Sequence, residues 1–151
     1  LALYRRANGA NLDGVVFGTH AALPALRERG GGSIVATASL AGLVPVAMDP
    51  IYAANKHAVV GFGRSMADAL APDAIRFNVV CPGFAESGII AGMRDALIDS
   101  GFTIIPAQAV ADAVVALFEG EDTGTAVVIQ SGREPIPYAF RNVPGPRPLP
   151  D

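Results

Sequence analysis

The sequence predicts an α/β fold in which three parallel strands are flanked by helices. Three short apolar runs, at residues 34–38, 75–81 and 126–130, have the length and β-branched content of buried strands. The segments around them carry apolar residues at helical spacing instead. Such an alternation of buried strands and helices is typical of a parallel sheet.

The first helix is expected over residues 12–29, with a bend at Pro24. Three glycines at residues 30–32 then end the helix and lead into the strand at residues 34–38. A glycine-rich loop that binds phosphate follows a strand and precedes a helix. These glycines have the reverse order, so we interpret them as a turn.

A second helix is expected over residues 50–70. Asp49 is a suitable N-cap residue, and Pro50 is favourable in the first turn. Gly61 and Gly63 lower the intrinsic stability of this helix. We therefore expect a close backbone contact at these glycines.

Three residues of this region predict acid–base chemistry. Tyr52 and Lys56 are four residues apart on the expected helix, so the phenol and the ammonium share one face. A free tyrosine has a pKa of about 10, and a nearby cation lowers that pKa by favouring the phenolate. Ser39 follows the first strand, where its hydroxyl is expected to hold a carbonyl or alcohol oxygen in front of the phenol.

The last third of the chain is less specific. Residues 84–102 have an amphipathic pattern, which ordinary core packing would give. Residues 107–118 predict a further helix. Residues 141–151 are rich in proline, and we expect an extended or disordered tail.

Composition excludes several classes of protein. The chain has 151 residues and 51% hydrophobic content, which suits one domain with a sizeable core. A net charge of −3 and a single lysine, Lys56, argue against nucleic acid as a partner. Cys81 is the only cysteine, which excludes an intrachain disulfide and fits a reducing cytoplasm. His20 and His57 have no partners at ligand spacing, so we expect no metal site.

The uncharged stretch at residues 30–48 is long enough to raise the question of a membrane span. Its glycines, its hydroxyl residues and Pro45 argue against that interpretation. We expect a buried strand that runs into a loop, and no membrane association.

Five motifs occur in a fixed order along the chain. They are Asn11-Leu12-Asp13-Gly14, the segment from Gly32 to Gly42, Tyr52-Ala53-Ala54-Asn55-Lys56, the segment from Ile75 to Gly83, and Ser87. This ordered set resembles the short-chain dehydrogenase/reductase family, from about Asn11 to Gly132. Since the order matches as well as the motifs, coincidence is a poor explanation.

The resemblance implies a catalytic tetrad of Asn11, Ser39, Tyr52 and Lys56. By resemblance, Tyr52 is the general acid or base and Ser39 binds the reacting oxygen. Lys56 is implied to hold the ribose hydroxyls of a nicotinamide cofactor, NAD or NADP, and to bias Tyr52, which also touches the cofactor. Asn11 is implied to support a water that relays protons to the lysine.

The resemblance also implies a set of contacts beyond the second strand. Pro82 and Gly83 are expected to shape the wall beside the nicotinamide, and the backbone of Ala85 to face its carboxamide. Ser87 stands where the family more often has threonine, and it keeps the hydroxyl.

The substrate is expected to be a small carbonyl compound or alcohol. Relatives carry a mobile substrate lid at the position of residues 84–102, so the resemblance implies a lid there as the alternative to core packing. The apolar residues Phe84, Ile89, Ile90 and Met93 of this stretch suggest that the substrate is apolar. In the family, the helices expected at residues 12–29 and 50–70 often form a dimer interface, which implies a homodimer or homotetramer. Packing within one chain explains the same helices equally well.

One feature of the family is missing from the sequence. Members begin with a glycine-rich turn over the cofactor diphosphate, and this chain has none. We therefore expect residues 1–140 to be the C-terminal part of a Rossmann-like, doubly wound parallel sheet that lacks the N-terminal cofactor half, followed by the tail at 141–151. Two hypotheses result: a nicotinamide-dependent oxidoreductase, or a non-catalytic fragment or interaction module.

Overall fold

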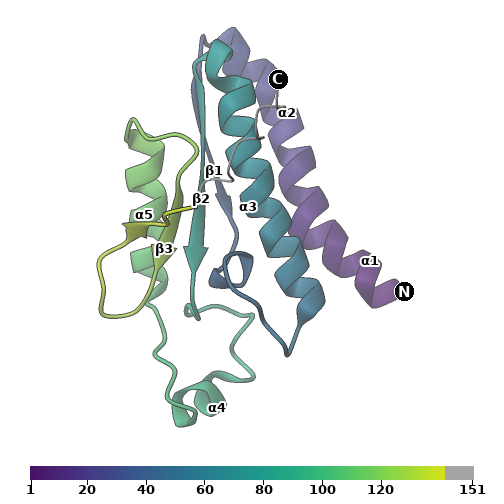
Figure 1. Ribbon diagram of the computed structural model, residues 1–151, viewed down its shortest axis with the longest axis vertical. Helices are drawn as coiled ribbons and strands as arrows, with labels where there is room; N and C mark the ends of the chain where they lie inside the picture. The colour runs from purple at the N-terminus through teal and green to yellow at the C-terminus, as the bar shows by residue number, and fades with distance from the viewer. Residues whose placement is uncertain (142–151) are drawn as a thin grey trace, which may run out of the picture.

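In the computed structural model, which describes residues 1–141, a four-stranded sheet lies between two layers of helices (Figure 1). Strands β1 (Gly32–Thr37), β2 (Ile75–Pro82) and β3 (Ala126–Ile129) are parallel neighbours in that order. The α/β class with three parallel strands is therefore confirmed. A short strand β4 (Ile136–Pro137), which the sequence did not predict, runs antiparallel to β3 at the edge of the sheet.

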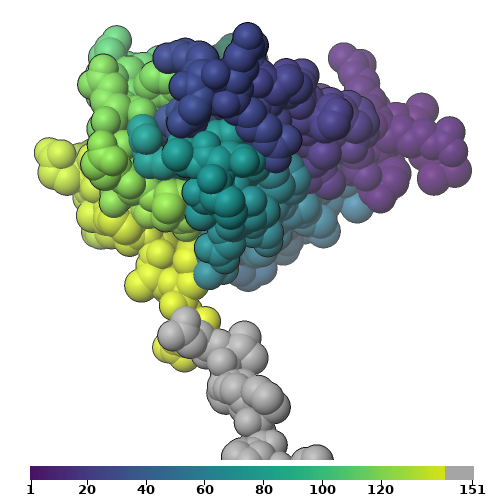
Figure 2. All heavy atoms as spheres, turned by 90° about the horizontal axis from the view of Figure 1, so that it is seen from above, coloured from purple at the N-terminus to yellow at the C-terminus, as the bar shows by residue number. Residues whose placement is uncertain are grey.

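Two long helical stretches cover one face of the sheet (Figure 1). The first consists of α1 (Ala2–Asn8), the π-helical turn η1 (Gly9–Asp13) and α2 (Gly14–Glu28). The second is α3 (Pro50–Leu70). The first stretch begins earlier than residue 12, where the sequence placed its start, and in the view from above α1 projects from the body of the protein (Figure 2).

Helix α5 (Ala107–Glu119) covers the other face of the sheet (Figure 1). Between β2 and α5, only α4 (Arg94–Asp99) is helical, so most of the 84–102 stretch consists of turns. Because each face of β2 is covered, this strand is buried along almost its whole length. Parallel strands covered in this way read as continuous apolar runs, which explains why β2 was found easily in the sequence.

The core has two parts, one on each face of the sheet. Phe77 of β2 is fully buried on the α3 side, where its ring meets that of Phe62 edge-on with 5.8 Å between ring centres. On the α5 side, Val80 of β2 packs in a second cluster with Leu117 of α5 and Ile129 of β3. The sheet is thus held by apolar packing on both sides.

The glycines at 30–32 form the turn that the sequence predicted, and the last of them is the first residue of β1. Gly30 and Gly31 have φ angles of 79° and 136°, which L side chains rarely adopt. A short 3-10 helix, η3 (Ala71–Asp73), makes the corresponding turn before β2. Most of the expected tail at 141–151 lies outside the described residues.

Candidate active site

The site begins where β1 ends. Ser39 is the N-cap residue of a short 3-10 turn, η2 (Leu40–Gly42), and its Oγ accepts a hydrogen bond of 3.2 Å from the backbone N–H of Ala41. The same hydroxyl lies 3.4 Å from the carbonyl oxygen of Pro82, to which it donates a long hydrogen bond. The Ser39 hydroxyl is therefore fixed between the carboxyl ends of two neighbouring strands, where open α/β sheets bind ligands.

Tyr52 and Lys56 lie together in the first turns of α3. Asp49 caps this helix by accepting a 2.9 Å hydrogen bond from the backbone N–H of Tyr52, and Pro50 occupies its first turn. Lys56 Nζ lies 5.5 Å from the centre of the Tyr52 ring. The helix thus holds the two side chains on one face, as their spacing predicted.

Lys56 reaches from α3 to the end of β1. Its side chain is buried, with a residue exposure of 8%, and Nζ donates a 3.1 Å hydrogen bond to the carbonyl oxygen of Thr37. Burial lowers the pKa of Lys56 below its ordinary value of 10.5, and the nearby Cys81 thiol partly opposes this shift. The ammonium group therefore connects the helix that carries Tyr52 to the strand that leads to Ser39.

Cys81 lies close to Ser39 and Lys56, and the sequence did not predict that it belongs to this region. It is fully buried on β2, and burial raises the pKa of its thiol from 9.0 to about 11. A hydrogen bond from the Ser39 backbone and the charge of Lys56 act in the opposite direction. The thiol therefore stays protonated at neutral pH, as expected for a structural cysteine.

Asn11 lies on the π-helical turn η1, which packs against α3. Its Nδ2 donates a 3.0 Å hydrogen bond to the carbonyl oxygen of Ala7, one turn earlier. Single π-helical turns inside α-helices are rare and often occur at functional sites. The sequence pattern did not predict this turn, because apolar spacing does not distinguish one wide turn from ordinary helix.

The segment after β2 folds back on itself. Ala85 forms an isolated parallel bridge with Ile105: Glu86 donates to the Ile105 carbonyl at 2.9 Å, and Ile105 donates to the Phe84 carbonyl at 2.8 Å. In this pairing the N–H and C=O of Ala85 point away from Ile105. The N–H and C=O of Ala85 are therefore available to a partner on the side of the segment that faces away from Ile105.

The residues expected to contact substrate differ in exposure. Ile90 is buried, whereas Ile89 is 89% exposed. Phe84 and Met93 are also exposed, and the Phe84 ring meets that of Phe102 edge-on at 5.1 Å. In this arrangement Ile90 anchors the segment, and its neighbours offer apolar surface.

The structure thus brings Ser39, Tyr52 and Lys56 to the carboxyl ends of β1 and β2. Pro82 ends β2 beside Ser39, and Gly83 continues the sheet by donating 3.0 Å to the Ile129 carbonyl. Ser87 lies at the start of the following segment and is exposed. Among residues 1–141 there is no cluster of metal-ligating side chains, and no helix is long and apolar enough to cross a membrane.

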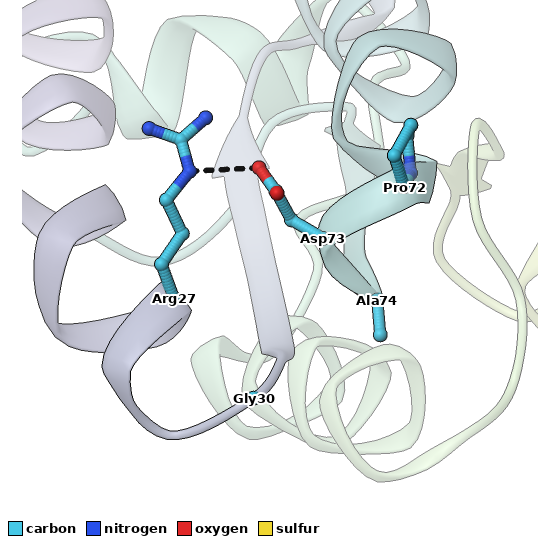
Figure 3. Close-up of a pocket in the computed structure, with 5 residues that line it drawn as sticks. All are labelled: Arg27, Gly30, Pro72, Asp73 and Ala74. Carbon is cyan, nitrogen blue, oxygen red and sulfur yellow. Dashed lines mark hydrogen bonds and ion pairs between the residues drawn. The ribbon is translucent and has the colours of Figure 1, made fainter.

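A separate groove of 270 Å³ lies at the opposite end of the strands (Figure 3). It is lined by Gly30 before β1 and Ala74 before β2, and its walls are joined by an ion pair of 2.7 Å between Arg27 and Asp73. Arg27 is half exposed, so this pair contributes little to stability. None of the candidate site residues lines this groove.

Comparison with known proteins identifies the class to which this chain belongs. The family model described as short chain dehydrogenase matches residues 3–97, and the chain belongs to this family. The chain is 44% identical over 85 residues to mouse 15-hydroxyprostaglandin dehydrogenase (NAD+), which is 53% of this chain and 32% of the mouse protein.

Two solved structures are similar in fold. The 3-oxoacyl-(acyl-carrier protein) reductase of Brucella melitensis superposes with a TM-score of 0.75 and 30% identity, covering 87% of this chain and 53% of the reductase. ElxO with NADP bound superposes with a TM-score of 0.72 and 25% identity, covering 81% and 54%. The chain therefore spans about half the length of these solved proteins, and less of the mouse enzyme.

Proposed function

We propose that the protein is an oxidoreductase that transfers a hydride between a nicotinamide cofactor, NAD or NADP, and a carbonyl compound or secondary alcohol. The observation that carries this proposal is the position of Ser39 and of the Tyr52–Lys56 pair at the carboxyl ends of β1 and β2. Family membership supports it, as do the relative described as NAD+-dependent and the similar structure with NADP bound.

The residues present fit a nicotinamide cofactor. The Lys56 ammonium has three N–H groups, and among residues 1–141 only the Thr37 carbonyl accepts from it. A buried cation with donors to spare suits the adjacent hydroxyls of a ribose. The backbone groups of Ala85, turned away from Ile105, suit a carboxamide, and Pro82, Gly83 and Ser87 adjoin them. When bound, the cofactor supplies or takes the hydride.

The side chains of this chain handle the proton and the reacting oxygen. Ser39 Oγ holds the carbonyl or alcohol oxygen, and Tyr52 Oη donates a proton to it in reduction or accepts one in oxidation. The Lys56 charge, 5.5 Å from the Tyr52 ring, attracts the negative charge that the phenol oxygen carries without its proton. Asn11, on the turn that packs against α3, supports a proton relay to Lys56.

The substrate in this proposal is apolar. Phe84, Ile89 and Met93 are exposed on the segment that follows β2, and this segment starts just after Pro82, whose carbonyl accepts from Ser39. Ile90 fixes the same segment by packing inward. Exposed apolar side chains beside a polar site favour a ligand with one oxygen function on an apolar body.

The test is Tyr52→Phe in the complete protein that the gene encodes, with cyclohexanol as probe and either NAD+ or NADP+. Loss of the hydroxyl should lower turnover about 10²- to 10⁴-fold, while cofactor binding measured by fluorescence stays close to wild type. Tyr4→Phe is the control, because Tyr4 lies exposed on α1. Turnover retained in Tyr52→Phe contradicts the mechanism.

A second candidate function is an interaction module without catalysis. The specific observation is the open edge of β1, which pairs with β2 on one side and with no described strand on the other. An unpaired parallel edge is a template for another chain. Titrating the purified 151-residue chain with NADH separates the two functions. A change in nicotinamide fluorescence on binding favours the enzyme. A chain that forms a dimer but causes no change in nicotinamide fluorescence favours the module.

The remaining expectations belong to the same proposal. Residues 1–140 form the part of the family domain that carries the candidate site, and residues 141–151 are rich in proline. The protein is a homodimer or homotetramer in the cytoplasm, where a single buried thiol such as Cys81 is stable. Gel filtration of the complete protein tests the oligomeric state.

A further inference from the structure

Three glycines around α3 differ in what surrounds them. A Cβ on Gly61 would meet no atom within 4 Å, so this glycine has open space. A Cβ on Gly63 would collide with a methyl group of Val79 and lie 3.1 Å from the Phe77 ring. The sequence predicted a close contact at both positions, and the structure places one at Gly63 alone.

The tightest contact with the backbone of α3 comes from Gly42. A Cβ there would lie 2.6 Å from the carbonyl oxygen of Lys56, 2.9 Å from its carbonyl carbon and 3.0 Å from a methyl group of Val60. Gly42 has no positive φ angle, so an alanine would suffer no backbone strain. Its effect would come from this overlap, which the Lys56 backbone, held inside a helix, cannot relieve by rotating.

Gly42 also belongs to the turn that carries Ser39. Its N–H donates a 2.8 Å hydrogen bond to the Ser39 carbonyl and closes η2, while the Ser39 side chain accepts from the next turn residue, Ala41. Lys56 also contacts the end of β1, since its Nζ donates to the Thr37 carbonyl. The turn that carries Ser39 therefore packs against the backbone of Lys56, and the ammonium group of Lys56 lies beside Tyr52.

We propose that Gly42 is a positioning residue: its missing side chain lets the Ser39 turn rest on the Lys56 carbonyl, and this contact sets the spacing between Ser39 Oγ and the Tyr52–Lys56 pair. The kinetic consequence rests on the proposed function, whereas the geometric consequence does not. A displacement of the order of 1 Å in such a site costs up to about 10²-fold in rate.

The experiment compares Gly42→Ala with two matched variants in the complete protein. Gly42→Ala should lower kcat about tenfold to a hundredfold, with cofactor affinity within about twofold of wild type, because the Lys56 side chain keeps its place. Gly61→Ala should leave kcat unchanged and raise Tm by about 2–4 °C, since alanine favours helix. Gly63→Ala serves as the destabilised control, because its overlap involves Val79 and Phe77 side chains away from η2.

Either of two kinetic results overturns the proposal. One is an unchanged kcat in Gly42→Ala. The other is an equal loss of kcat in Gly63→Ala at the same fall in Tm, because the loss in Gly42→Ala would then follow from lower stability alone.

Crystal structures of wild type and Gly42→Ala provide a test without turnover. The Ser39 turn should move away from the Lys56 carbonyl, and an unmoved turn also overturns the proposal. An inactive wild type would contradict the proposed oxidoreductase but leave this structural test intact.

Discussion

The junction of α3 with the strand ends and the segment from residue 84 to residue 105 are built differently, although both belong to the candidate site. At the junction, Ser39 and Lys56 are fixed by hydrogen bonds to strand carbonyls, and Gly42 brings two backbones into contact. In the segment, Phe84, Ile89 and other apolar side chains are exposed, and it is held by a short bridge to Ile105 and by the buried Ile90. In the proposed function, proton transfer would rely on the rigid elements of the junction, and substrate choice would rely on the looser segment.

The largest effect is expected from Lys56→Met. In the proposed function this change removes the charge beside Tyr52 and should lower turnover about 10²- to 10⁴-fold. Stability should fall little or rise, because burial already penalises the Lys56 charge and Met has a similar apolar length. Steady-state kinetics and thermal melting measure the two effects. Arg29→Met, at an exposed position after α2, is the control. An equal loss of activity in this control would show that the effect of Lys56→Met is not specific to the charge beside Tyr52.

The next effect compares two phenylalanines, one in each region. Phe77 is fully buried beneath α3, so Phe77→Ala should cost about 3–5 kcal/mol of unfolding free energy. Phe102 is 51% exposed beside Phe84, and Phe102→Ala should cost less than about 1 kcal/mol. Guanidinium unfolding of both variants measures the difference. Equal costs would show that the segment is packed as firmly as the core.

The sequence predicted the rigid region well and the looser region poorly. Strands β1, β2 and β3 and helix α3 were found because buried strands and the Asp49-Pro50 cap leave strong local patterns. The 84–102 stretch gave an amphipathic pattern but only α4 is helical, since its apolar residues divide between a buried Ile90 and exposed neighbours. The π-helical turn and β4 were missed because each is short and depends on tertiary contacts.

The candidate site shows the same limit. The spacing of Tyr52 and Lys56 predicted their shared face, and the structure has them at 5.5 Å. The place of Cys81 beneath Ser39 and Lys56, and the contact of Gly42 with the Lys56 carbonyl, depend on the register of β1 with β2 and on how α3 crosses them. No local pattern encodes such a distance, so these residues appeared only in the structure.

A smaller effect is expected in the alkaline stability of the junction. The folded protein holds the Cys81 proton up to a pKa of about 11, against an ordinary value of 9.0, so this contribution is full below pH 9.0 and disappears as the pH rises through about 11. Its size is at most about 3 kcal/mol. Lys56 acts in the opposite direction, since its pKa is lowered and its contribution grows as the pH rises towards 10.5.

Cys81→Ala isolates the thiol contribution. Denaturant unfolding at a series of pH values from 7 to 11 should show a flatter alkaline decline in this variant than in wild type, with Lys56 present in both. The lost side-chain volume lowers stability at every pH and so does not change the slope. Identical slopes would show that the Cys81 thiol is not kept protonated by its burial.

The smallest effect on stability is expected at Ile89, and it sharpens the contrast between the two regions. Ile89 is 89% exposed, so Ile89→Ser should change the free energy of unfolding by less than about 0.5 kcal/mol. If the segment selects an apolar substrate, Ile89→Ser should raise KM for that substrate several-fold and change kcat little. Apolar contacts of this kind stabilise the bound substrate and the transition state equally. A fall in kcat at constant KM would instead show that Ile89 affects the chemical step. The junction and the segment would then not have separate roles in proton transfer and substrate selection.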